Sequence, residues 1–333
     1  MRTICLLCTL CAACASTRVY LPEIRDAFSA EAGELELRVV RSGDLDPARA
    51  RDPDRAMRNT VALAGRYLAR ERGTGSNRRY VRALLACAYL ARGETRLARM
   101  ALAADQPAQG NLLSRENRVV RAVHYAVGAC RGVQARGALE EMFSGRLAVV
   151  DFVEEFGSYV GIAIPGPDDP GRKRVLANAV EDLERSCFGP ASSAPEARRG
   201  DLRRLASEQI YNESAALLVA LTPIPADAEP SAVEIWLAAV CANLFVDYAY
   251  LIRDMLPVPL NGEQKQWQRE QVRPTYAGAR KLVERFLSPG EIGTILPQAT
   301  PRDVTGPGRA YARHLYGRLL DAEIVVLGWI STR

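Results

Sequence analysis

Four cysteines near the N-terminus have the spacing with the clearest potential for chemistry. Cys5, Cys8, Cys11 and Cys14 form a C-x2-C-x2-C-x2-C run, and cysteine thiolates at short spacings can hold an iron–sulfur cluster. The bacterial ferredoxin run has a longer last gap and a following proline. Here leucine, threonine and alanine fill the gaps, so the pattern does not predict a cluster.

Residues 1–14 have the layout of an export signal. One basic residue, Arg2, precedes a short apolar run, and small residues from Ala12 to Ser16 follow it. This order is typical of a signal peptide. The apolar run from Thr3 to Cys11 is far shorter than the roughly 20 residues of a membrane-spanning helix, so we do not expect it to serve as a permanent transmembrane anchor.

The sequence Ala12-Ala13-Cys14 resembles the lipobox of bacterial lipoproteins. The resemblance implies that the Cys14 thiol is acylated, with palmitate-type chains, and becomes the new N-terminus. It also implies a place in the cell envelope, at the periplasmic face or the surface. The sequence departs from the lipobox at Cys11, where leucine is usual. Ala13-Cys14-Ala15 also fits the A-x-A cleavage rule, so ordinary cleavage after Ala15 remains the alternative.

Catalytic signatures are scarce along the chain. The two histidines, His124 and His314, lie far apart, and no H-E-x-x-H, G-x-S-x-G, Walker or dinucleotide-binding pattern occurs. Glu154 and Glu155 are neighbours in sequence, so on a helix they point to different sides and cannot flank one bond. We therefore expect no metal site and no cofactor, and an enzyme is the less favoured class.

The composition predicts a globular protein with a balanced surface. Of the 333 residues, 48% are hydrophobic and 25% are charged, which is sufficient for a substantial core. The net charge of +5 comes from 44 basic and 39 acidic residues interspersed along the chain, so no nucleic-acid partner is expected. We expect the isolated cysteines to be small buried thiols, although sequence cannot assign disulfides. These cysteines are Cys87, Cys130, Cys187 and Cys241.

Helical periodicity dominates the chain. Apolar residues recur three and four apart, with alanine and arginine between them. The predicted helices cover 56–72, 79–91, 95–104, 115–126, 137–143 and 174–187. Three strand-like runs, 34–40, 147–153 and 323–330, can also belong to buried helices. The expected fold is all-α, an irregular array of helical hairpins of the α-solenoid type.

One stretch, 79–107, resembles the tetratricopeptide repeat. The matching residues are Leu85, Ala86, Tyr89, Gly93, Ala98 and Leu102. Ala86 and Ala98 would be the points where the two helices approach closely. The match covers about one repeat of roughly 34 residues, and it departs at Asp105 and Pro107. The resemblance implies a region of paired helices over 15–188 that binds proteins, and a generic pair of alanine-rich helices is the alternative.

The C-terminal region, 200–333, is organised around one apolar helix. Ser231 and Glu234 have the spacing of a capping box, and the helix continues to Leu256 before Pro257. Between 235 and 252 the only charged residue is Asp247. An aspartate in the centre of a span costs about 2.5–3.5 kcal/mol, which makes membrane insertion marginal. A buried core helix is therefore expected.

Polar side chains follow one face of this helix and of the last helix. Asn243, Asp247, Tyr250 and Asp254 are spaced by four, three and four, which places them on one face. Tyr311, His314 and Arg318 have compatible spacing. The face is either a solvated side or the lining of a groove for a ligand or partner. Tyrosine and arginine suit a protein interface.

The function expected from these patterns is that of an exported, lipid-anchored module that binds or scaffolds proteins in the cell envelope. Its partners would be envelope proteins, and the acyl chains would attach it to the membrane. Two alternatives stay open: an all-helical envelope enzyme that acts on cell-wall glycan, and a small-ligand carrier with an enclosed pocket near the 235–256 helix. The segment 189–200 permits a domain boundary near residue 195.

Overall fold

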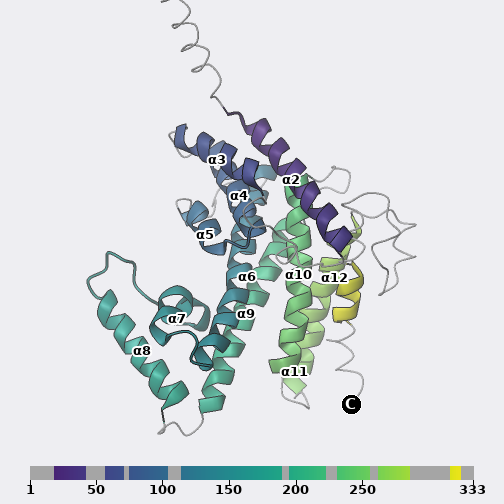
Figure 1. The fold of residues 1–333 in the computed structure, drawn as a ribbon. Helices are drawn as coiled ribbons and strands as arrows, with labels where there is room; N and C mark the ends of the chain where they lie inside the picture. The colour runs from purple at the N-terminus through teal and green to yellow at the C-terminus, as the bar shows by residue number, and fades with distance from the viewer. Residues whose placement is uncertain are drawn as a thin grey trace, which may run out of the picture. The chain divides into compact units, whose positions relative to one another are not determined.

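The computed structural model describes residues 19–42, 57–70, 75–103, 114–189, 195–222, 231–255, 262–285 and 316–323. Within these ranges every regular element is a helix and none is a strand (Figure 1). The predicted all-α helical array is therefore confirmed. The helices form two compact units, made of residues up to 124 with 227–236, and of 125–226 with residues from 237 onward.

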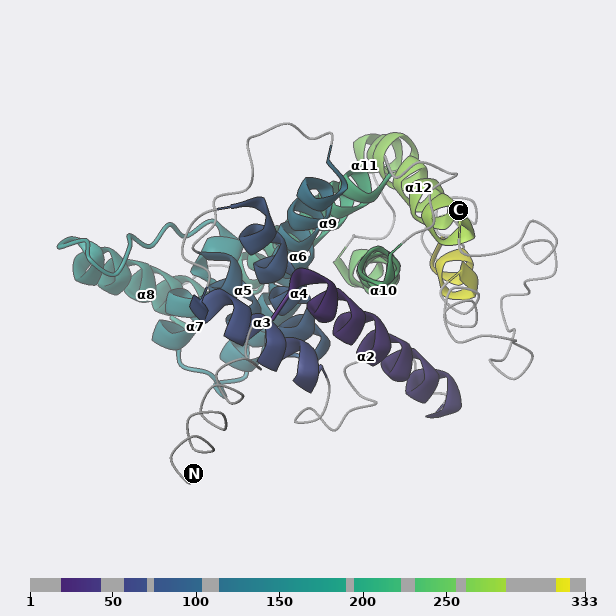
Figure 2. The same ribbon diagram turned by 90° about the horizontal axis from the view of Figure 1, so that it is seen from above.

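The first unit is built around one buried helix. It contains α2 (Leu21–Ser42), α3 (Arg58–Arg70), α4 (Ser76–Ala91) and α5 (Thr95–Ala103), together with the first turns of α6 (Arg115–Phe143) and α10 (Ala232–Met255). α4 carries alanine, leucine and valine on all sides and is buried along most of its length, as expected of a helix without a polar face. It packs against α2, α3 and α5 (Figures 1 and 2).

A tight turn joins α4 to α5. Gly93 has a left-handed backbone, with φ of 78°, which glycine adopts without steric cost. Its N–H donates to the Leu90 carbonyl at 2.9 Å, and the N–H of Glu94 donates to Tyr89 at 2.9 Å, the hydrogen-bond pair of a Schellman ending. Ala86 and Ala98, on the two adjacent helices, are both fully buried. The tetratricopeptide resemblance itself stays a prediction.

The start of α3 is capped by a side chain from another helix. Glu31 of α2 accepts hydrogen bonds from the backbone N–H groups of Asn59 at 2.8 Å and Thr60 at 2.9 Å, and from the Thr60 hydroxyl at 2.7 Å. These N–H groups have no partner inside the helix. Met57, directly before α3, cannot cap it through its thioether and has a positive φ of 53°. The cap therefore comes through tertiary contact.

The second unit begins with the remainder of α6 and continues through α7 (Val149–Phe156), η1 (Gly157–Val160), α8 (Arg172–Phe188) and α9 (Pro195–Leu221). α7 lies beside α8, and α8 beside α9. Large apolar side chains from four helices meet in one cluster, among them Leu139, Phe152, Leu183 and Leu202, all with no exposed surface. This cluster is a core of the unit.

The second unit continues with the remainder of α10, α11 (Gly262–Trp267), the π-helical η2 (Gln268–Val272), α12 (Arg273–Glu284) and a helix over 316–323. Tyr276 of α12 is buried, and its hydroxyl donates to the Phe245 carbonyl of α10 at 2.5 Å. Leu237, Cys241 and Phe245 are buried as well, so the described side chains of α10 confirm the predicted core helix. Across the described residues, no helix is both long and apolar enough to span a bilayer.

Several helix boundaries differ from those predicted. The two helices expected over 115–126 and 137–143 are one continuous helix, α6. The strand-like run 34–40 lies inside α2, and the run 147–153 overlaps α7. α9 begins at Pro195, inside the segment 189–200, and both ends of that segment belong to the second unit. The boundary near residue 195 therefore does not coincide with the division between the units.

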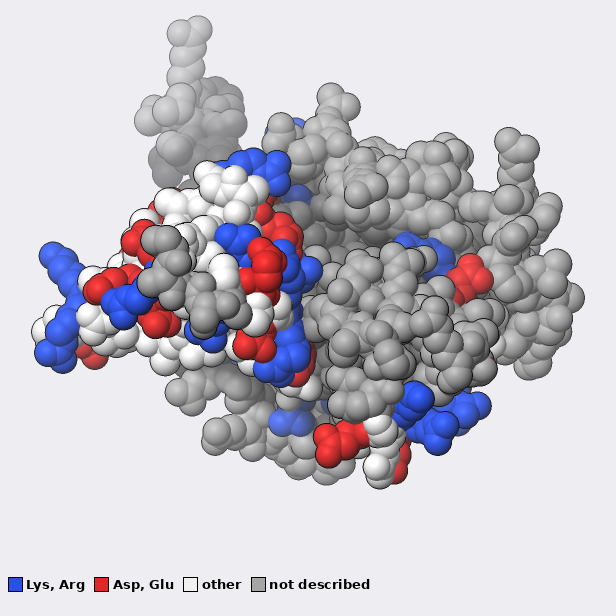
Figure 3. All heavy atoms as spheres, turned by 90° about the horizontal axis from the view of Figure 1, so that it is seen from below, with Lys and Arg blue, Asp and Glu red and all other residues white. Residues whose placement is uncertain are grey.

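Charges of both signs are interspersed on part of the described surface. On the face drawn in Figure 3, arginine and lysine side chains lie among aspartate and glutamate side chains over much of the coloured area. On α8 and α9 many of these groups pair, as Arg185 does with Glu181 and Arg204 with Glu208. Among the cysteines of the described ranges, Cys87, Cys187 and Cys241 are buried, and Cys130 is half-buried.

Candidate functional site

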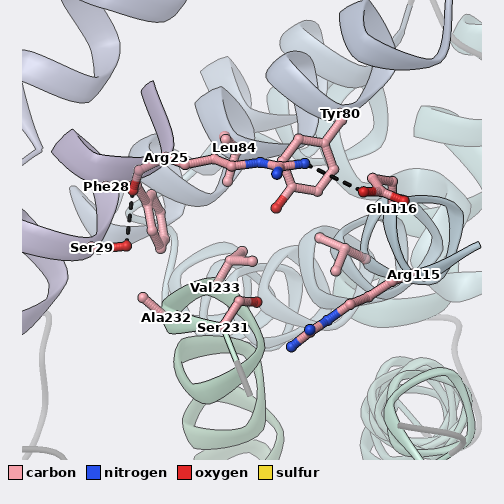
Figure 4. A pocket seen from close by; sticks show the side chains of 11 residues that line it. Arg25, Phe28, Ser29, Tyr80, Leu84, Arg115, Glu116, Ser231, Ala232 and Val233 are labelled. Atoms are coloured by element: carbon pink, nitrogen blue, oxygen red, sulfur yellow. Dashed lines mark hydrogen bonds and ion pairs between the residues drawn. The ribbon is translucent and has the colours of Figure 1, made fainter. Parts of the chain in front are cut away.

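A cavity of about 200 Å³ opens in the first unit (Figure 4). α2 contributes Arg25, Phe28 and Ser29, and α4 contributes Tyr80 and Leu84. The remaining walls are the first turn of α6, with its continuation to Val119, and the residues at which α10 begins, Ser231 to Val233. Charged, aromatic and aliphatic groups thus meet in one space.

Arg25 is the more accessible of the two arginines that line the cavity. Its guanidinium lies over the face of the Tyr80 ring, 4.8 Å from the ring centre. One nitrogen, Nη2, is 3.4 Å from Oε1 of Glu116, and the two side chains are 43% and 44% exposed. Figure 4 shows the Arg25 side chain running across Tyr80 toward Glu116. Arg25 therefore has one buried aromatic neighbour, Tyr80, and one exposed acidic neighbour, Glu116.

Arg115 is held much more firmly. Its Nε donates to Oε1 of Glu234 at 2.8 Å, and its Nη2 donates to Oε2 of the same carboxylate. Glu234 is only 2% exposed, while the Arg115 side chain is 39% exposed. Two parallel hydrogen bonds between a guanidinium and a carboxylate form the strongest geometry available to such a pair. Arg115 is thus fixed at the cavity wall.

The same glutamate, Glu234, caps the start of α10. The backbone N–H of Ser231 donates to Oε2 of Glu234 at 2.7 Å, which confirms the carboxylate half of the predicted capping box. The serine half differs: the Ser231 hydroxyl donates to Glu234 at 2.7 Å instead of accepting from the backbone of the first turn. An ionised carboxylate is a strong hydrogen-bond acceptor, so the Ser231 hydroxyl donates to Glu234.

The surroundings shift the pKa values of the buried groups in opposite directions. Burial works to raise the pKa of Glu234, but the hydrogen bonds from Arg115 and Ser231 outweigh it and hold that pKa below its ordinary value. Burial raises the pKa of Tyr80, although the positive charge of Arg25 opposes the shift. Tyr80 is therefore a neutral phenol at pH 7, and Glu234 is a carboxylate.

These groups equip the cavity for recognition. Guanidinium groups bind carboxylates and other anions, and Phe28, Leu84 and Val119 offer apolar contact beside them. Pockets with a few placed polar groups in an apolar wall are typical ligand sites. Within the described ranges, no group of three or more histidine, cysteine, aspartate or glutamate side chains could hold a metal ion.

The structure brings together two of the side chains predicted to bind, in the second unit. Nη1 of Arg318 is 3.4 Å from Oδ1 of Asn243, and both residues are half-buried. Asp247, Tyr250 and Asp254 belong to α10, but their side chains lie outside the described set. Tyr311, His314 and Cys14 lie outside the described residues. The predicted polar face therefore stays a prediction beyond the contact between Asn243 and Arg318.

The adjacent glutamates at the end of α7 each face a different arginine. Oε1 of Glu154 lies 3.3 Å from Nη2 of Arg172. Glu155 lies 3.8 Å from Nη1 of Arg131, and its carbonyl accepts a hydrogen bond from the same arginine at 3.0 Å. The two carboxylates point to different partners, as helical geometry requires of neighbours in sequence.

Comparison of the chain with protein-family models, with curated proteins and with solved structures finds no match. The candidate site therefore rests on geometry. The sequence indicated part of it, because the Ser231–Glu234 spacing predicts a helix start and the helix predicted over 115–126 begins at Arg115. The role of Arg25, and the pairing of Arg115 with Glu234 across 119 positions, could not be found from sequence.

Proposed function

We propose that this chain is a binding module of the bacterial cell envelope. In this proposal, acyl chains on Cys14 tether the protein to the membrane, and the helical body recruits an envelope partner by contact. One acyl chain gives only marginal membrane binding, so several chains at the cysteine would be needed for stable anchoring. The lipobox-like sequence Ala12-Ala13-Cys14 supports the tether.

The observation that carries the binding role is the cavity of the first unit. It combines Arg25 and Arg115 with the aromatic rings of Phe28 and Tyr80. Arginine and tyrosine are enriched among the residues that dominate protein interfaces. Arg115 is preorganised by Glu234, which lowers the entropy lost when a partner binds. We infer that a partner inserts a side chain or a chain end here.

The tether is tested by metabolic labelling with an alkyne-bearing palmitate in the native host. We expect the label on the intact protein and none on Cys14→Ser, with the wild-type protein in the membrane fraction. Cys87→Ser is the matched control, because it removes one thiol from α4 and leaves the signal untouched. Label that persists in Cys14→Ser would refute acylation at this residue.

The binding role is tested by photocrosslinking in living cells. A photoreactive amino acid placed at Glu116, at the cavity edge, should give an adduct of one defined mass with an envelope protein. The control position is Glu181 of α8, which is exposed and lies in the second unit. A defined adduct that forms from Glu181 but not from Glu116 would move the binding surface away from the cavity.

A small-ligand carrier is the second candidate, because the cavity lies where α10 begins, at Ser231, Ala232 and Val233. Such a carrier would yield a low-molecular-weight ligand on denaturation of the purified protein. Mass spectrometry of the released fraction distinguishes it from the protein-binding module. The two candidates share the site and differ in the size of the occupant.

A further inference from the structure

We propose that the cavity of the first unit recognises a carboxylate joined to one apolar group of amino-acid size. This inference rests on the proposed function, in which the cavity is the binding surface, and it adds the chemical class of what binds there. The carboxylate would pair with Arg25, and the apolar group would lie against Phe28, Leu84 and Val119. The ligand would be either the C-terminal residue of a polypeptide or a free acid of the same chemistry.

Arg25 is the group that can change partners. Its pairing with Glu116 has a single contact at 3.4 Å, and both side chains are more than two-fifths exposed. Exposed ion pairs of this kind contribute little to stability. An incoming carboxylate can therefore displace Glu116 from Arg25, and Glu116 can turn to the solvent. The Tyr80 ring would keep the guanidinium in place during the exchange, because the two groups are stacked at 4.8 Å.

Arg115 cannot make the same exchange. Its partner Glu234 is only 2% exposed and also accepts hydrogen bonds from Ser231. Withdrawing Arg115 would leave a buried carboxylate without its counterion, which is strongly unfavourable. Arg115 thus forms a fixed wall.

The apolar wall distinguishes among anions. Phe28, Leu84, Val119 and Val233 offer no hydrogen bonds from their side chains to a fully hydrated ion such as phosphate. Burying such an ion against them would remove water that nothing replaces. An amphipathic acid fits both sides of the cavity. Its volume of about 200 Å³ is below that of drug-sized ligand pockets, roughly 300–1,000 Å³, so one apolar group of residue size is the expected fit.

Isothermal titration of the purified full-length protein tests the inference. The probes are N-acetyl-leucine and N-acetyl-leucinamide, which differ in charge and share the apolar group. We expect the acid to bind and the amide to bind at least about tenfold more weakly, as expected for loss of a charge-assisted hydrogen bond. Equal affinity for both probes, or no heat of binding from the acid at millimolar concentration, would overturn the proposal.

Two variants of opposite expected effect test the exchange. Arg25→Met should weaken binding of the acid by about tenfold or more. Glu116→Gln should tighten it by about two- to fivefold, because it removes a competitor of the size of an exposed ion pair. Arg185→Met and Glu181→Gln are the matched controls, since they alter an exposed ion pair on α8. If Glu116→Gln weakens binding as much as Arg25→Met does, the ion pair is structural and the exchange is wrong.

A six-residue peptide that ends in leucine, as the free acid and as the amide, identifies the source of the carboxylate. Tighter binding of the peptide acid than of N-acetyl-leucine supports a polypeptide C-terminus, and exclusion of the peptide supports a free acid. The photocrosslinking result is independent of these titrations. An adduct at Glu116 without carboxylate binding refutes the ligand class and leaves the binding module standing. Carboxylate binding without any envelope adduct supports the ligand class and refutes the protein-binding module.

Discussion

Arg115 and Glu234 are 119 residues apart in sequence and form a two-point ion pair, with 2.8 Å between Nε and Oε1. Glu234 also binds the N–H and the hydroxyl of Ser231. One carboxylate therefore caps α10 and fixes the first residue of α6. The start of α10 and the contact with α6 depend on the same carboxylate. Removing either Arg115 or Glu234 should therefore weaken more than the ion pair alone.

The Arg115→Met variant should lower the free energy of unfolding by about 3 kcal/mol, because it leaves the buried Glu234 without its counterion. Chemical denaturation followed by circular dichroism measures the change. The double variant Arg115→Met/Glu234→Met should recover part of the loss, since no unpaired charge remains. A single variant that unfolds within about 0.5 kcal/mol of wild type would show that water compensates Glu234.

Glu140 should make the second unit sensitive to acid. Hydrogen bonds from Arg203, at 2.8 and 2.9 Å, and from Arg136 lower the pKa of Glu140 to about 2. Since the folded pKa lies below the ordinary value of 4.5, the stabilisation is present above about pH 4.5 and is lost as the pH falls toward 2. The difference in unfolding free energy between wild type and Glu140→Gln should therefore shrink between pH 6 and pH 2.5. Equal differences at both pH values would contradict this assignment, and Glu181→Gln controls for the loss of one exposed charge.

Two glycines of α6 should respond to alanine in opposite ways. A Cβ at Gly132 would lie 2.7 Å from Cγ1 of the buried Ile210, so Gly132→Ala should destabilise the protein by about 1–3 kcal/mol. A Cβ at Gly137 would meet nothing within 4 Å, so Gly137→Ala should stabilise the protein by about 0.5–1 kcal/mol through helix propensity. Thermal unfolding of both variants checks the pair. A stabilising Gly132→Ala would mean that α6 and α9 pack less closely.

The cysteines should differ in reactivity. Burial raises the pKa of the Cys241 thiol and that of Cys187, which lowers the thiolate fraction that attacks alkylating reagents. Cys130 is half-buried, and we expect iodoacetamide to modify it before Cys87, Cys187 and Cys241. Peptide mapping by mass spectrometry after timed quenching gives the order. All four should react at similar rates in denaturant, and fast labelling of Cys241 in the folded protein would contradict its burial.

The sequence predicts the fold well where alanine, leucine and arginine keep a helical period. The predicted helix 79–91 corresponds to Ser76–Ala91, and 174–187 corresponds to Arg172–Phe188. Gly93 marked the turn after α4 because only glycine adopts its backbone conformation without strain. α9 was not predicted: its first half is highly charged and its last turns are apolar, so no single apolar stripe follows its length.

The candidate site was harder to predict than the helices. The capping box was visible because Ser231 and Glu234 are three residues apart. The partner of Glu234 was not visible, since any of the many arginines could have filled that role. Arg25 lies in α2, which the sequence patterns did not predict as a helix. Contacts between distant helices depend on how the helices pack, and local periodicity carries no information about this.

The capping of α3 by Glu31 has a consequence for how the first unit is assembled. The two N–H groups that Glu31 satisfies belong to α3, and the carboxylate belongs to α2. A synthetic peptide of α3 alone would lack this cap and would fray at its first turn. During synthesis on the ribosome, α2 emerges before α3, so the Glu31 carboxylate is available as an acceptor when α3 emerges. The order of the two helices along the chain thus suits vectorial folding from the N-terminal side.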